Sequence, residues 1–128
     1  MTETMKTTQP IVELAKANDE FRKVVMTGDK MQVVLMAVPE GGEIGAETHD
    51  GHDQVLIFVE GQGKAKIGDI EADVKAGDLS FVPSGEFHNF VNTGSGMLKL
   101  YTMYAPPEHD AGTEHATKAE AEADPAEH

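Results

Sequence analysis

The sequence predicts a single all-β domain with the architecture of a jelly-roll barrel. Short runs rich in β-branched and aromatic residues recur at roughly ten-residue spacing, which is typical of a sandwich or barrel. Gly-rich turns separate the runs, in keeping with the 13 Gly and 6 Pro of the chain, and no long helical pattern interrupts them. A length of 128 residues suffices for one such domain with one core.

The elements can be placed in order along the chain. Residues 1–20 are expected to be an N-terminal segment, partly disordered, in which the apolar residues from 11 to 21 fit either a short helix or an irregular edge segment. A hairpin with strands at 24–26 and 31–38 follows, joined by a turn at 27–30. Further strands are expected at 54–60, 64–67, 70–74, 79–82, 87–91 and 97–104. The barrel is therefore predicted to span 21–108. Residues 109–128 are expected to be an acidic, solvated tail with room for a short helix over 117–123.

Charge and composition exclude several classes of function. The formal net charge of −13 would repel phosphate backbones and anionic lipid, so neither a nucleic acid nor a membrane surface is expected as a partner. No apolar run approaches the length of a membrane span, and the first residues lack the apolar stretch of a signal peptide. With no cysteine in the chain, a cytoplasmic location is the default expectation.

Two segments contain the residues that could bind a ligand or take part in catalysis. The first reads Gly41, five residues, Glu47-x-His49, four residues, Gln54, six residues, Gly61. The second reads Gly77, five residues, Pro83-x-Gly85, two residues, His88, three residues, Asn92. These spacings resemble the two motifs of the cupin superfamily, and the chain is similar to short single-domain bacterial cupins from about residue 21 to 122. The resemblance implies a double-stranded β-helix barrel around one divalent metal ion.

The ligand set that the resemblance implies is Glu47, His49, Gln54 and His88. Most metal-binding cupins resemble one another in offering three His and one Glu, whereas here Glu47 stands in the place of the first His and Gln54 in that of the Glu. Residues two apart in a strand share a face, so Glu47 and His49 are expected to point together into the barrel. Two imidazoles and a carboxylate suit Fe, Mn, Ni or Zn. The alternative is a metal-free pocket lined by the same side chains.

Other polar residues lie outside the implied ligand set. Glu47 and Glu86 are candidate catalytic groups that would shuttle a proton. His52 is an alternative ligand to Gln54, but Gly51 beside it favours a solvated loop. The histidines at 109, 115 and 128 are expected to be exposed, with covering of the barrel mouth as the alternative for His109 and His115.

Function is expected to be that of a metal-dependent small-molecule enzyme, of oxygenase or isomerase type. The alternative is a non-catalytic module that binds a sugar or an organic acid. A homodimer is expected by resemblance to other single-barrel cupins. The charge-free stretch 33–38 fits burial in a dimer interface, or else a fully covered central strand.

Overall fold

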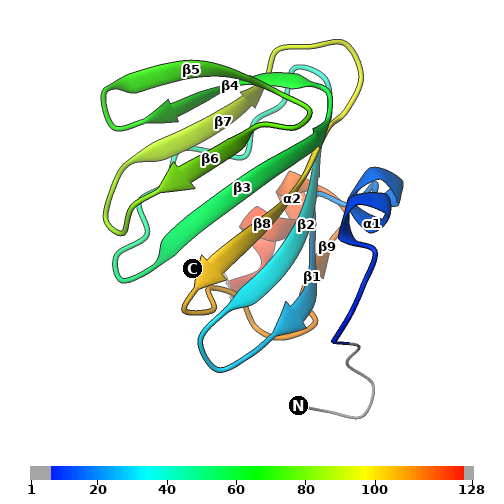
Figure 1. The fold of residues 1–128 in the computed structure, drawn as a ribbon, viewed down its shortest axis with the longest axis vertical. Helices are drawn as coiled ribbons and strands as arrows, with labels where there is room; N and C mark the ends of the chain where they lie inside the picture. The colour runs from blue at the N-terminus through cyan, green and yellow to red at the C-terminus, as the bar shows by residue number, and fades with distance from the viewer. Residues whose placement is uncertain (1–6, 126–128) are drawn as a thin grey trace.

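The computed structural model describes residues 7–125, and its framework is a pair of antiparallel sheets (Figure 1). The larger sheet has the strand order β6-β3-β8-β2-β1-β9 and the smaller the order β5-β4-β7. The strands are β1 (Arg22–Thr27), β2 (Gln32–Val38), β3 (Asp53–Glu60), β4 (Gln62–Ile67), β5 (Ile70–Lys75), β6 (Leu79–Val82), β7 (His88–Asn92), β8 (Leu98–Ala105) and β9 (Glu114–His115). The predicted all-β jelly-roll class is confirmed.

Strand β3 shows how the sequence pattern sets the two faces of the larger sheet. Gln54, Leu56 and Phe58 are buried toward the interior, while Val55 and Ile57 between them are half-buried on the outer face. The strand lies between β6 and β8, so its backbone is hydrogen-bonded on both sides. Its first inward-facing residue, Gln54, is thereby fixed at the end of the barrel where the loops gather.

The charge-free stretch of β2 is explained by cover on both of its faces. Val34, Met36 and Val38 point into the core, whereas Leu35 packs beneath helix α1 (Ile11–Ala17) on the outer face. Figure 1 shows this helix beside β1 and β2. The uncertain segment 11–21 is therefore helical over its first part, because its apolar residues have a sheet face to pack on. Of the two alternatives for 33–38, the structure shows a central strand that α1 covers.

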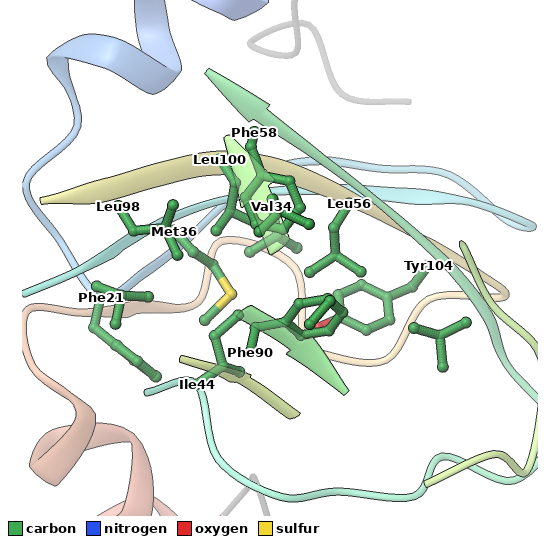
Figure 2. Close-up of a cluster of buried hydrophobic side chains, with 14 of the residues drawn as sticks. Phe21, Val34, Met36, Ile44, Leu56, Phe58, Phe90, Leu98, Leu100 and Tyr104 are labelled. Carbon is green, nitrogen blue, oxygen red and sulfur yellow. The ribbon is translucent and has the colours of Figure 1, made fainter. Parts of the chain in front are cut away.

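The core fills the space between the sheets (Figure 2). Phe58 from the larger sheet and Phe90 from the smaller sheet meet with ring centroids 6.0 Å apart. Leu56, Leu98 and Leu100 have no exposed surface. This apolar floor lies next to the polar end of the barrel, because the ring of Phe90 is 6.1 Å from that of His88.

The C-terminal segment differs from the expected solvated tail. Glu114 and His115 pair with β1 as strand β9, and helix α2 (Lys118–Ala123) buries Ala121 in the core cluster. His115 is only 4% exposed and bonds Asp124 at 2.8 Å, so the expectation of an exposed His115 is wrong. The composition of this segment does not predict its packing on the barrel. The residues that pack there are single small or polar residues within an acidic segment. His128, and the rest of 126–128, lie outside the described residues. Neither helix in the described part of the chain is long and apolar enough to cross a bilayer.

Candidate metal centre

Glu47 and His88 lie directly opposite each other at the open end of the smaller sheet. The amide of Glu47 donates to the carbonyl of His88 and the amide of His88 donates back to that of Glu47, both at 2.9 Å. A residue pair that exchanges both backbone bonds projects its side chains to the same face of the sheet. The loop residue Glu47 is therefore held beside the first residue of β7 by sheet geometry.

His49 joins this pair two residues after Glu47. Its carbonyl accepts a bond from the amide of Gly85 at 2.9 Å, and Gly85 has the positive φ of 82° that this turn requires. The rings of His49 and His88 lie 5.2 Å apart. One potential ligand atom from each of Glu47, His49 and His88 falls within 4.8 Å of the other two. Three of the four predicted ligands thus converge.

The contact between His49 and Glu47 is short but is not aligned as a hydrogen bond. Nε2 of His49 lies 2.7 Å from Oε2 of Glu47. The same Nε2 is buried and has no aligned hydrogen-bond partner within residues 7–125. Once His49 loses its proton, the Nε2 lone pair and the Glu47 carboxylate oxygen face each other at this short distance, and a bound cation can bridge them.

His88 has one ring nitrogen occupied and one available. Its Nδ1 lies 3.1 Å from the carbonyl oxygen of Glu86, which favours a proton on Nδ1 and leaves the Nε2 lone pair free. Burial of the ring lowers its pKa, although the Glu86 carbonyl and the Glu47 charge act in the opposite direction. Burial therefore favours the neutral imidazole, which is the form that binds metals.

Gln54, the fourth predicted ligand, carries an unsatisfied oxygen. Its Nε2 donates to Oγ1 of Thr102 at 3.1 Å, while its Oε1 is buried without a hydrogen-bond partner in the described part of the chain. Gln54 as a whole is 4% exposed. A buried amide oxygen left unpaired is costly, and a metal ligand bond would relieve that cost. This orphaned oxygen and the histidine–carboxylate donor set both fit a divalent ion.

Glu108 is a neighbour of the site that the two motifs do not contain. Its Oε1 lies 3.4 Å from Nδ1 of His49, and its Oε2 lies 3.1 Å from Nε2 of His52. His52 is thereby placed against Glu108, while its own Nδ1 lies 2.8 Å from the carbonyl oxygen of Pro106. The only sequence signal for Glu108 is its place directly after the Ala105-Pro106-Pro107 run. That signal does not reveal which histidine it faces.

The electrostatics of the cluster follow from these contacts. Glu108 and Glu47 together raise the pKa of His49 to about 9, against the effect of its burial. Burial alone would raise the pKa of Glu47, but His49, Arg22 and His88 outweigh it and the net shift is downward. The pKa of Glu108 is also lowered, because its histidine neighbours outweigh burial. In the metal-free protein, a protonated His49 therefore lies between two carboxylates.

The side chains of Glu86 and His109 do not belong to the group formed by Glu47, His49 and His88. The Glu86 side chain is exposed and lies against Gly68 on the outside of the barrel, so Glu86 reaches His88 through its backbone only. The His109 ring packs edge-on to Tyr104 with centroids 5.3 Å apart. His109 is half-buried and lines the cavity described next, in agreement with the alternative that it covers the barrel mouth.

A cavity of about 270 Å³ opens beside Glu47 and His49. Its walls come from β1, from the loop at 43–47, from the 108–109 segment and from α2. The charged lining residues are Arg22, Glu43, Glu47, Glu108, Lys118 and Glu122. The cavity is large enough for a small organic molecule and reaches two of the candidate ligands.

Comparisons with known proteins agree with this fold. Residues 34–104 match the family model described as the cupin domain. The chain is 42% identical over 112 residues to the uncharacterized protein YrkC of Bacillus subtilis, a match that covers 83% of this chain and 60% of YrkC. It is 33% identical over 68 residues to a Thermotoga maritima protein named oxalate-binding protein, covering 53% of this chain and 56% of that one. The chain thus spans less than two thirds of these relatives.

Solved structures extend the similarity. The crystal structure of BH2720 from Bacillus halodurans superposes with a TM-score of 0.92 at 38% identity, covering 95% of this chain and 97% of that one. A Thermotoga maritima protein described as a predicted oxalate decarboxylase superposes with a TM-score of 0.58 at 26% identity, covering 62% of this chain and 69% of that one.

Proposed function

The chain belongs to the cupin domain family, and from this premise we propose that it binds one divalent first-row metal ion and acts on a small organic acid beside it. The observation that carries the proposal is the convergence of Glu47, His49 and His88 within 4.8 Å. The unpartnered Oε1 of Gln54 supports a fourth ligand. Two imidazoles, one carboxylate and a neutral amide oxygen leave a bound divalent ion with a net positive charge of about one.

Each residue of the site has a defined part in this proposal. His49 and His88 would hold the ion through Nε2, Glu47 through its carboxylate and Gln54 through Oε1. When bound, the ion supplies a Lewis acid for an oxygen ligand or, if it is redox-active, a centre for oxygen chemistry. Glu47 is the better placed of the two candidate proton carriers, because Glu86 faces outward over Gly68. A proton-transfer role for Glu86 stays a prediction from the sequence.

A small organic acid is proposed as the ligand for two reasons. The bound ion would add positive charge beside a cavity whose lining already holds Arg22 and Lys118, and this charge would offset the four carboxylates that line the same cavity. The descriptions of the Thermotoga maritima matches mention oxalate, one as that of a binding protein and one as that of a predicted decarboxylase. Those two descriptions also define the competing functions, which are turnover of the acid and binding without turnover.

The experiment begins with metal-free protein and titrates Fe(II), Mn(II), Ni(II) and Zn(II) by calorimetry, with metal content measured by plasma mass spectrometry. We expect one ion per chain in the wild type and none in the double variant His49→Ala/His88→Ala, whose folding is checked by circular dichroism. Oxalate is then added to metal-loaded and metal-free protein. Binding that requires metal supports the proposal, and product formation distinguishes an enzyme from a binding protein. A wild type that binds none of the four ions would overturn the proposal.

A homodimer is part of the proposal as well. Leu79 and Phe81 on the edge strand β6 are 59% and 50% exposed and point away from the core. They lie opposite the half-buried Ile57 and Val55 of β3, so the outer face of the larger sheet is apolar at this edge. An exposed apolar patch at the unpaired edge of a sheet favours association with another chain. A second copy of this chain is the proposed partner.

A further inference from the structure

When a histidine binds a metal through Nε2, its metal affinity depends on the group that accepts a hydrogen bond from its Nδ1. An acceptor at Nδ1 fixes the tautomer and the ring orientation, and loss of such an acceptor typically weakens metal affinity by about 10- to 100-fold. For His88 the acceptor is the carbonyl oxygen of Glu86, at 3.1 Å. For His49 the group that faces Nδ1 is the carboxylate of Glu108, at 3.4 Å. The two histidines therefore have different supports, one from the backbone and one from a side chain distant in sequence.

Glu108 can serve this purpose because its backbone is fixed. Gln32, which is 1% exposed, accepts bonds through Oε1 from the amides of Glu108 and His109 at 3.2 and 3.0 Å. Its Nε2 donates to the carbonyl of His109 at 2.7 Å and to Oγ1 of Thr27 at 3.0 Å. A buried polar side chain with all of these bonds made is a rigid support. Gln32 thus ties the start of the C-terminal segment to β2.

The second oxygen of Glu108 adds a further restraint. Oε2 lies 3.1 Å from Nε2 of His52, whose Nδ1 lies 2.8 Å from the Pro106 carbonyl oxygen. The carboxylate is therefore held between two imidazoles, and each of its oxygens faces one ring. The carboxylate is also three-quarters buried, which strengthens both contacts relative to a surface ion pair.

We propose that Glu108, held in place by Gln32, is a positioning residue that orients His49 and sets its tautomer, and thereby the metal affinity of the site. The inference rests on the proposed metal-binding function. It assigns to the Pro106–His109 loop a part in the centre although that loop contributes no ligand.

The test compares Zn(II) affinity, by competition with a chromophoric chelator, among wild type, Glu108→Ala and Glu108→Gln. Glu108→Ala should bind Zn(II) about 10- to 100-fold more weakly. Glu108→Gln keeps an oxygen that can accept from Nδ1, so it should recover most of the affinity. Glu114→Gln is the control, because Glu114 does not line this cavity and pairs with Lys23 instead of a histidine, and the Zn(II) affinity of this variant should be that of the wild type.

A second measurement separates orientation from a loss of folding. Nitrogen-15 NMR of the Zn-loaded protein reports the tautomer of each imidazole, and wild-type His49 should carry its proton on Nδ1. In Glu108→Ala the His49 Nδ1 proton signal should be lost or exchange rapidly, while the signal of His88 stays unchanged. Wild-type Zn(II) affinity in Glu108→Ala, with an unchanged His49 signal, would overturn the positioning role alone. Absence of Zn(II) binding in the wild type would overturn the metal proposal and this inference together.

Discussion

Oγ1 of Thr102 accepts a hydrogen bond from Nε2 of Gln54 at 3.1 Å and donates its own proton to the carbonyl of Val55 at 2.8 Å. A hydroxyl has one proton, and here that proton is committed to the backbone. Thr102 can therefore only accept from Gln54, so the NH₂ end of the amide must face it. The amide oxygen is left facing away from Thr102 and without a hydrogen-bond partner in the described part of the chain, which leaves it available for the ligand role proposed for Gln54.

Thr102→Val should remove this control over Gln54. The buried NH₂ group would lose its acceptor, which costs on the order of 1–3 kcal/mol in the free energy of unfolding. The amide could then rotate, and Zn(II) affinity should fall several-fold. Urea denaturation and chelator competition measure the two effects. Thr102→Ser keeps the hydroxyl and is the control, so equal Zn(II) affinity in the Val and Ser variants would contradict the orienting role.

Phe90→Ala should destabilise the barrel directly beneath the site. Phe90 is 1% exposed and contacts both Phe58 and His88, so its removal leaves a cavity between the sheets. The expected loss is about 3–5 kcal/mol in the free energy of unfolding. Phe87→Ala is the matched control, since Phe87 is 41% exposed, and its effect should stay within about 1 kcal/mol. Comparable losses in the two variants would show that the core does not lie where the structure places it.

Much of this site could be predicted from local sequence rules. The motif spacing that resembles the cupins predicts Glu47, His49 and His88, and the structure brings these three together, although Glu47 and His49 lie in a loop and not on a strand. It also predicts Gln54, whose buried side chain lies at the start of β3. Glu108 could not be predicted in this way, because it lies 59 positions beyond His49 (108 − 49) and its approach depends on Gln32. No periodicity connects residues whose contact is set by where a loop crosses the barrel mouth.

The C-terminal segment shows a second limit of sequence reasoning. Acidic composition is typical of solvated chain, and only Ala121 and His115 of β9 and α2 are buried. Two buried residues produce no hydrophobic pattern that stands out from a random one. The sequence of residues 11–21 leaves a helix and an edge segment open for the opposite reason. Its apolar residues were evident, but the sheet face that favours the helical arrangement was not.

The stability of the metal-free protein should depend on pH through His49. Its pKa in the folded state is about 9, above the ordinary value of 6.5, so the folded state holds the proton more tightly than the unfolded state. The stabilisation from this histidine is therefore complete below about pH 6.5 and is lost as pH rises toward about 9. We expect the unfolding free energy of the wild type to exceed that of His49→Gln by on the order of 2 kcal/mol near pH 6.

That difference should shrink as the pH rises from 6.5 to about 9 and vanish above pH 9, where folded His49 loses its proton and both proteins carry a neutral side chain at this position. Urea unfolding of chelator-treated protein at intervals of one pH unit measures it. The comparison is made above about pH 5. Below that pH, the stabilisation that Glu47 and Glu108 give through their lowered pKa values is itself lost as the carboxylates are protonated. A difference that is constant from pH 6 to 9 would contradict the charged arrangement of His49 between the two carboxylates.

The proposed dimer makes a prediction about β6. Light scattering coupled to size-exclusion chromatography should give a mass near twice the 13.8 kDa of the chain. Phe81→Glu places a charge at the centre of the apolar edge and should give the monomer, since an unpaired charge buried in an interface is strongly unfavourable. Ile70→Glu is the control, because Ile70 is 71% exposed but lies on β5 in the other sheet, and this variant should stay dimeric. A wild type that runs as a monomer at micromolar concentration would refute the dimer, and dissociation by Ile70→Glu in place of Phe81→Glu would move the interface to the smaller sheet.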